Sequence, residues 1–553
     1  MFIFLIFTRL NNLIGFNKDV KTFKVFANKF RRPRKKTSTV ILVENRRFFI
    51  DYIALLAFLP VAVDYYESNV VVYEMCKKNL SKQLKSRARH FFSVVKKIAH
   101  CKFLFVVANN SYIPKHQKIV NDLFSSNLDK QKIESFSYRG ILLGDLIYDF
   151  YLRKFKVPTL NLTDINLKSI IYEYLQYTDE FFKYFAEHQV KAVVVSHSAY
   201  GYGIPARIAA FKGIDAFLIM DLLWLTRIRS DQLFPQTQNF VNLPEKFSEL
   251  TPLSQEKALI FASERMALRI KGKKVDLRLA PSVVDWEAWN ITETASKEDG
   301  KKICLIALHD FVDAAHRYGN NFYPDFWEWI LGIGNLTKNS NVFFLLKPHP
   351  NSQYNALEHL TEICRLFPQF KLISGSTDNS NLIKEGVSHC LTVHGHIASE
   401  MASQGVITIN AGRINPHMDY DFSLTPSSKV EFESAIQNMD SLNLDINLSK
   451  IYEFYFTHHL MNLTSWIIPE IDKLWSEFGT SRIMNNSKIL DYYLSTSNKI
   501  SIECLHVAVT RFLNSNDMKI ERRHFSNFQC TENVPCTCEK VYSFNGIIEY
   551  IKE

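Results

Sequence analysis

Three short polar stretches in the second half of the chain carry residues that could bind a phosphate and move a proton. They are HDFVDAAH from His309, KPHP from Lys347 and HGHIASE from His394. Each follows an apolar run that is typical of a buried strand. Imidazoles, carboxylates and a lysine at strand ends are suited to general acid–base catalysis and to anion binding.

The KPHP stretch holds a histidine rigidly at the end of a predicted strand. Pro348 and Pro350 restrict the backbone around His349 and prevent a helix from starting there. Lys347 places a positive charge beside the imidazole. A cation next to a hydrogen-bonding ring suits a phosphate group. The alternative is that His349 only completes a turn.

The HGHIASE stretch combines a glycine with the predicted start of a helix. Gly395 would let the backbone approach a ligand closely. Unpaired amide groups at a helix start near Ile397 would favour an anion, and Ser399 could add a hydroxyl group. Glu400 could reach a ribose diol, or it could merely favour the helix start by its negative charge.

Two further loops add candidates for substrate contact and proton transfer. HDFVDAAH supplies two carboxylates and two imidazoles, which could act as a general base or bind sugar hydroxyls, although its aspartates could also only cap a helix. In the first half, His197 follows the apolar residues of KAVVVSHS and could face the same cleft. The alternative is a histidine that only completes a turn. Small polar side chains that could contact a base or phosphate follow the strand FKLIS, among them Ser376 and Thr377.

The elements that must position these residues alternate between strand and helix. Short apolar runs bounded by helical segments indicate parallel βαβ units, in which ligands bind beyond the carboxyl ends of the strands. We therefore predict an α/β fold with two Rossmann-like doubly wound domains that face a cleft. The predicted segments are an acceptor-side domain at 37–220, a connection at 221–300, a donor-binding domain at 301–425, a helical extension at 426–500 and a tail of unclear structure at 501–553.

Composition limits the class of protein. The chain has 553 residues, 47% of them hydrophobic, which excludes a disordered protein, and a net charge of +10, which favours anionic partners. No apolar run reaches the ~20 residues of a membrane-spanning helix, so we expect a cytoplasmic protein. The basic run at 29–36 is either a solvated linker or a contact with anionic lipid headgroups. No nucleic-acid-binding motif is found.

Nine cysteines scattered along the chain fit a reducing compartment. Cys530, Cys536 and Cys538 lie close together near the C-terminus. They lack a second CxxC pair and a nearby histidine in zinc spacing, which favours plain thiols over a metal knuckle. No metal site is therefore predicted.

The chain also resembles a known family. KPHP followed by VHGHIASEMASQGVITINAG is similar to the donor-binding domain of GT-B glycosyltransferases that make bacterial surface polysaccharides. The resemblance is greatest to the capsule and lipopolysaccharide group with a His-Pro motif. YRGILLGDLIYDFYLR at 138–153 and SHSAYGYGIPARIAAFKG at 196–213 resemble the acceptor-side half of such proteins. The resemblance spans roughly residues 130 to 425.

This resemblance implies a nucleotide-sugar donor, with CMP as one candidate nucleotide, and a lipid-linked or polysaccharide acceptor at the inner face of the membrane. It implies no metal and no further cofactor. Family members have Ser or Thr where this chain has His394 and His396, which leaves the donor open. The implied donor-side residues are Lys347, His349, Ser399 and Glu400, and the implied acceptor-side residues are Asp145, His197 and Arg207.

An inverting transfer needs a base beside the acceptor hydroxyl, for which the candidates are Asp313, His309 and Asp145, in that order. Two other hypotheses stay open. A sugar-nucleotide 2-epimerase on the same fold would use the carboxylates of HDFVDAAH and would need no acceptor. A non-catalytic scaffold of polysaccharide biosynthesis would bind no nucleotide.

Overall fold

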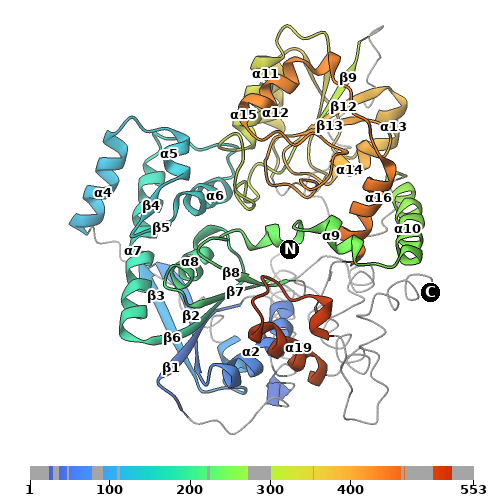
Figure 1. Ribbon diagram of the computed structural model, residues 1–553. Coiled ribbons are helices and arrows are strands. Elements are labelled where there is room, and N and C mark those ends of the chain that lie inside the picture. The colour runs from blue at the N-terminus through green and yellow to red at the C-terminus, as the bar shows by residue number, and fades with distance from the viewer. Residues whose placement is uncertain are drawn as a thin grey trace, which may run out of the picture.

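Two parallel sheets form the centres of two lobes in the computed structural model of the protein (Figure 1). The structure describes residues 21, 24–25, 27–28, 36–46, 49–77, 91–108, 113–220, 224–271, 301–350, 352, 354–461, 466–467 and 502–525. The predicted pair of doubly wound α/β domains is confirmed. The terminal cysteines at 530–538 and nearly all of the basic run at 29–36 lie outside the described residues.

The N-terminal lobe has a six-stranded sheet in the order β3-β2-β1-β6-β7-β8, in which only β8 is antiparallel to its neighbour. Its central strands are almost wholly apolar because helices cover both faces. The strands are β1 (Thr39–Glu44), β2 (Asn69–Lys77), β3 (Cys101–Ala108), β6 (Gln189–Val195), β7 (Asp215–Met220) and β8 (Trp224–Ile228). The sheet thus runs a few residues into the segment that the sequence presented as a connection.

Helices and a small hairpin surround this sheet. Gly213 ends the last helix before β7 with a positive φ of 68°, a backbone conformation that glycine adopts without a steric cost. The elements are α2 (Phe49–Tyr65), α4 (Pro114–Ser125), α5 (Lys130–Glu134), the hairpin β4 (Ser137–Tyr138) and β5 (Ile141–Leu142), α6 (Gly144–Phe155), α7 (Ile165–Glu187) and α8 (Gly203–Phe211).

The C-terminal lobe has a five-stranded, fully parallel sheet in the order β11-β10-β9-β12-β13. The strands are β9 (Ile303–Ala307), β10 (Phe343–Lys347), β11 (Phe370–Leu372), β12 (Val387–Thr392) and β13 (Ile407–Asn410). The helices are α11 (Phe326–Leu336), α12 (Leu357–Leu366), α13 (Asn379–Lys384), α14 (Ile397–Ala402) and α15 (Lys429–Gln437).

In both sheets the strand order reverses beside the first strand, between β1 and β6 and between β9 and β12. Such switch points leave a crevice at the carboxyl ends of the strands. His197 follows β6, His309 follows β9 and His394 follows β12. The fold therefore places three of the predicted site residues at switch points.

The remaining helices connect the lobes along one side (Figure 1). They form an apolar cluster of their own, in which α10 packs against α16. These elements are α9 (Leu243–Ser248), α10 (Pro252–Ile270), α16 (Leu448–Tyr455) and the π-helical turn η5 (Phe456–Met461). Among the described residues, no helix has both the length and the apolarity that crossing a bilayer requires.

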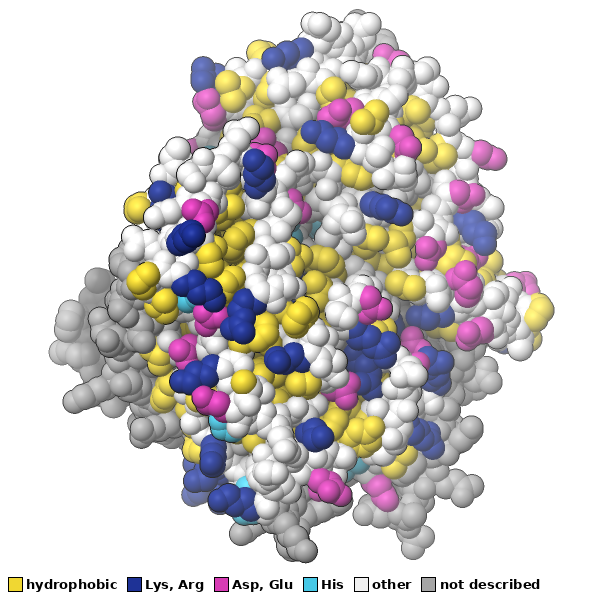
Figure 2. Space-filling view, turned by 60° about the vertical axis from the view of Figure 1, so that its left-hand side comes forward, with side chains coloured by type: hydrophobic (Ala, Val, Ile, Leu, Met, Phe, Trp, Pro, Cys, Tyr) yellow, Lys and Arg dark blue, Asp and Glu magenta, His cyan; other side chains and the backbone are white. Residues whose placement is uncertain are grey.

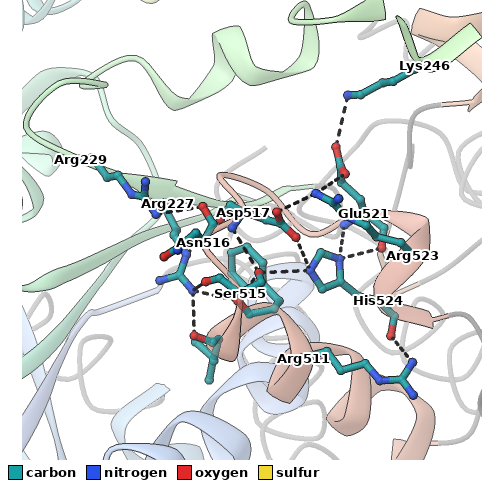
Figure 3. Close-up of polar contacts among 12 residues, drawn as sticks. Arg227, Arg229, Lys246, Arg511, Ser515, Asn516, Asp517, Glu521, Arg523 and His524 are labelled. Carbon is teal, nitrogen blue, oxygen red and sulfur yellow. Dashed lines mark hydrogen bonds and ion pairs between the residues drawn. The ribbon is translucent and has the colours of Figure 1, made fainter.

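The last described segment, 502–525, returns to the N-terminal lobe, where α19 (Ile502–Asn514) packs against α2 in the same apolar core. Arg227 on β8 secures it, because its guanidinium donates hydrogen bonds to the backbone oxygens of Phe512, Leu513, Ser515 and Asp517 (Figure 3). The sequence predicted no structure for this segment, although its residues complete the N-terminal core.

Candidate active site

Charged side chains from both lobes meet at Asp313, in the loop after β9. Its carboxylate lies 3.6 Å from Arg153 of the N-terminal lobe and 3.5 Å from Arg317 of its own loop. His197 and His349 are close enough to lower the pKa of Asp313. We call these five residues the interlobe cluster. The space-filling view shows a hollow between the lobes with histidine side chains inside it (Figure 2).

The carboxylate of Asp313 is ionised at neutral pH. Burial raises its pKa, but the charges of Arg317 and Arg153 outweigh burial and leave the pKa below its ordinary value. The side chain is still 38% exposed, so a ligand can reach it. Arg153 and Arg317 were missed in the sequence, although Arg317 stands one helical turn after Asp313, a spacing that often marks an ion pair.

His309 is arranged as a neutral hydrogen-bond donor. Its ring stacks on Phe326, with 4.7 Å between centroids, and its Nε2 accepts a hydrogen bond from the backbone amide of His394 at 3.4 Å. Burial lowers its pKa to about 3. Because Nε2 is an acceptor in a neutral ring, the proton must reside on Nδ1. His309 is therefore poorly suited to the role of general base that the sequence suggested.

His394 packs between aromatic rings at the same edge of the sheet. Its ring centroid lies 4.3 Å from that of His309 and 4.7 Å from that of Tyr318. Burial holds its pKa well below the ordinary value, so the ring is neutral. Its Nδ1 makes no hydrogen bond within the described part of the chain, which leaves a buried polar atom available to a ligand.

Lys347 and Glu400, which the sequence assigned to the donor, belong to one hydrogen-bonded chain. Lys347 Nζ donates to Asn379 Oδ1 at 2.6 Å, Asn379 Nδ2 donates to Glu400 Oε2 at 2.9 Å, and Arg269 Nε donates to Glu400 Oε1 at 2.6 Å. Burial lowers the pKa of Lys347 to about 8. Asn379 lies in the polar loop after FKLIS that the sequence indicated, but it was not singled out there, and Arg269 lies in a stretch without a recognisable motif.

The smaller predicted donor contacts are engaged with their own loops. Ser399 Oγ is buried and donates to the backbone oxygen of His396, and Ser376 Oγ lies 2.7 Å from Ser374 Oγ. Thr377 is buried and its hydroxyl makes no hydrogen bond among the described residues. Since α14 has only six residues, side chains rather than a helix dipole must carry any binding of phosphate there.

On the N-terminal side, His197 belongs to a hydrogen-bonded group at the β1/β6 switch point. Its Nδ1 lies 2.8 Å from Ser196 Oγ, and Ser196 donates from its amide and its hydroxyl group to the buried carboxylate of Glu44. Burial raises the pKa of Glu44. Glu44 ends β1 and could have been found as a carboxylate directly after an apolar strand.

Asp145 and Arg207 are placed against each other, not in the interlobe cluster. Arg207 donates to both carboxylate oxygens of Asp145, at 2.6 and 2.5 Å, and both side chains are buried. The hydrogen bonds from Arg207 occupy both carboxylate oxygens of Asp145, which leaves fewer acceptor sites for a substrate. We therefore interpret this pair as structural and do not retain it in the proposed site.

No protein-family model and no curated protein matches the chain at a significant level. Several solved structures have a similar fold. UDP-GlcNAc 2-epimerase from Neisseria meningitidis bound to UDP-GlcNAc is 11% identical, with 75% of this chain and 97% of that chain covered and a TM-score of 0.24. KpsC from Thermosulfurimonas dismutans, a beta Kdo 2,4 transferase, is 11% identical, with 51% and 86% covered and a TM-score of 0.30.

A third similar structure is an alpha,alpha-trehalose-phosphate synthase (UDP-forming) from Burkholderia vietnamiensis. It is 10% identical, with 79% of this chain and 100% of that chain covered and a TM-score of 0.26. Likeness at this level concerns the fold and does not extend to substrate or mechanism.

Proposed function

We propose that the protein is a glycosyltransferase that transfers a sugar from a nucleotide-activated donor to a bacterial surface polysaccharide or lipopolysaccharide acceptor at the inner face of the membrane. The observation that carries the proposal is the interlobe cluster, in which the ionised Asp313 of one lobe faces Arg153 of the other. Two substrates can be brought together where two lobes meet.

The donor would bind on the C-terminal lobe, with its phosphate beside Lys347 and His349. Lys347 is buried at the end of β10 and carries a positive charge that a phosphate can partner. Glu400 would accept hydrogen bonds from the ribose hydroxyl groups, and Asn379 would donate one to them. The carboxylate of Glu400 has more acceptor sites than its two present partners use. A CMP-linked donor is one candidate.

Asp313 would act as the general base on the acceptor hydroxyl. It is ionised and partly exposed, and Arg153 and Arg317 fix the direction of its carboxylate. Lys347 and His349 would stabilise the negative charge that develops on the leaving phosphate. His309 would donate a hydrogen bond from Nδ1, and no cofactor takes part in the proposed step.

The same loop would also serve a sugar-nucleotide 2-epimerase, because the ionised Asp313 could take a proton from the sugar. The two functions differ in their need for an acceptor. Purified protein would be given CMP-, UDP- and GDP-linked sugars with and without a mixture of lipid-linked oligosaccharides. Nucleotide release only with acceptor supports the transferase, whereas a changed sugar nucleotide without acceptor supports the epimerase.

A further inference from the structure

Three histidines gather where η5 packs near the loop after β12. His458 and His459 are neighbours in η5, and His396 precedes α14. One ring nitrogen of each lies within 4.8 Å of one ring nitrogen of the others. α14 and α16, the helix before η5, lie close together (Figure 1). Short π-helical turns such as η5 are frequent at functional sites.

A backbone contact fixes the tautomer of one of these rings. His458 Nδ1 lies 3.3 Å from the backbone oxygen of Asn239, an acceptor that places the proton on Nδ1 and leaves Nε2 as a lone pair. The ring centroid of His396 lies 4.9 Å from that of His458 and 5.2 Å from that of His459. His396 Nδ1 makes no hydrogen bond with any described residue.

The charge around the three rings does not oppose a cation strongly. Arg269 lies close to His396 and His459, but its guanidinium is paired with Glu400 at 2.6 Å. Lys519, a cation close to His458, donates a hydrogen bond to Asn239 Oδ1 at 3.3 Å.

We propose that His396, His458 and His459 bind one divalent transition-metal ion, with Zn²⁺ as the best match to three imidazole ligands. Three protein ligands leave a fourth position for water or a substrate atom, as in zinc sites that are not closed. All three side chains are only partly buried, so such a group can reach the ion.

The ion would join η5 to the loop that carries His394 and Gly395. It would thereby fix the position of η5, which lies among the helices that connect the lobes, against the loop after β12. This inference does not depend on the proposed transferase activity. The sequence did not reveal it, since His396 is far from the adjacent pair at 458–459 and the three share no spacing typical of a zinc site.

The full chain would be treated with chelator, desalted and titrated with Zn²⁺ by calorimetry, and with Co²⁺ by visible absorption. We expect one equivalent to bind, with the intense visible bands of a four-coordinate Co²⁺ site. His459→Ala and His396→Asn should each weaken binding by more than about 100-fold, beyond the 10–100-fold typical of losing an outer-shell partner. His188→Ala, at an exposed histidine that ends α7, is the matched control and should bind like the wild type.

The proposal is overturned if the wild type takes up no Zn²⁺, or if His459→Ala and His188→Ala bind it equally. It is also overturned if the cluster binds inorganic phosphate, with loss in His459→Ala, while Zn²⁺ does not compete. Circular dichroism of His459→Ala and His396→Asn distinguishes lost binding from lost folding. For a variant that folds, loss of the visible Co²⁺ bands supports the site and their retention overturns it.

Discussion

His316 Nδ1 lies 2.7 Å from Asp149 Oδ1, and this contact joins the two lobes through side chains that are both buried. Asp149 is on α6 of the N-terminal lobe, and His316 is in the same loop as Asp313. A second carboxylate on this border, Asp325, accepts hydrogen bonds from Tyr148 and Thr159 of the N-terminal lobe at 2.5 and 2.6 Å. The loop that carries the proposed base is therefore fixed by the opposite lobe.

The contact between His316 and Asp149 should make stability depend on pH. Burial alone would lower the pKa of His316, but the Asp149 carboxylate outweighs burial and raises the pKa to about 10, above the ordinary value of 6.5. A raised histidine pKa stabilises the folded state fully below about pH 6.5, and the contribution disappears as the pH rises through 10. Urea unfolding of the wild type and His316→Gln at pH 6.5, 8 and 10 would measure it.

We expect His316→Gln to lower the unfolding free energy by about 3–5 kcal/mol at pH 6.5, the usual cost of breaking a buried pair, and by much less at pH 10. Arg365→Ala is the control, because its pair with Glu362 is exposed and should contribute nothing measurable at any pH. A difference between wild type and His316→Gln that does not change with pH would contradict the charged state of His316.

The pair of Asp145 and Arg207 should stabilise the fold without taking part in catalysis. Either Asp145→Asn or Arg207→Met should lower the unfolding free energy by about 3–5 kcal/mol, because one buried charge loses its partner. The double variant Asp145→Leu/Arg207→Met should recover most of that loss. If the double variant is stable but inactive, with nucleotide binding intact, the acceptor-side role implied by the resemblance is supported instead.

Arg227 should hold the segment 502–525 on the N-terminal lobe. Arg227→Met removes a buried cation from several backbone acceptors and should cost about 3–5 kcal/mol, with faster proteolytic cleavage of the C-terminal segment. Arg229→Met is matched in chemistry but removes a single bond, to the backbone oxygen of Asn516 (Figure 3). Equal cleavage rates in the two variants would contradict this role.

Asp313→Asn should slow the proposed transfer strongly while leaving the donor bound. Removal of a general base typically slows a reaction by about 10²–10⁴-fold. Because the pKa of Asp313 is held below its ordinary value, the wild-type rate should show no acid limb from this group above about pH 4. Steady-state rates and calorimetry would be compared. A variant with wild-type turnover would exclude Asp313 as the base.

The sequence predicted the sheets well because their strands are short apolar runs with little ambiguity. β1, β6, β9, β10 and β12 all lie where the apolar runs are. The return of α19 to the N-terminal core could not be predicted, because it depends on apolar contacts with α2 that lie hundreds of residues away in the chain. Local patterns carry no information on such distant partners.

Residues at strand ends were easier to predict than their charge states or partners. His309, Asp313, His349 and His394 were selected because strand ends meet at one sheet edge. Whether His309 is a base or a donor depends on the amide of His394 and on burial against Phe326, neither of which has a sequence signature. The partner of Asp145 could not be predicted for the same reason, since Arg207 is remote in sequence.

Calorimetric titration of the purified full chain with CMP, CDP, UDP and GDP, beside His349→Ala and Glu400→Ala, tests the central claim most directly. We predict that one nucleotide binds and that both variants lose most of its affinity, because the phosphate loses its imidazole and the ribose its carboxylate. Folded wild-type protein that binds none of the four nucleotides would contradict the nucleotide-sugar site and favour a non-catalytic scaffold.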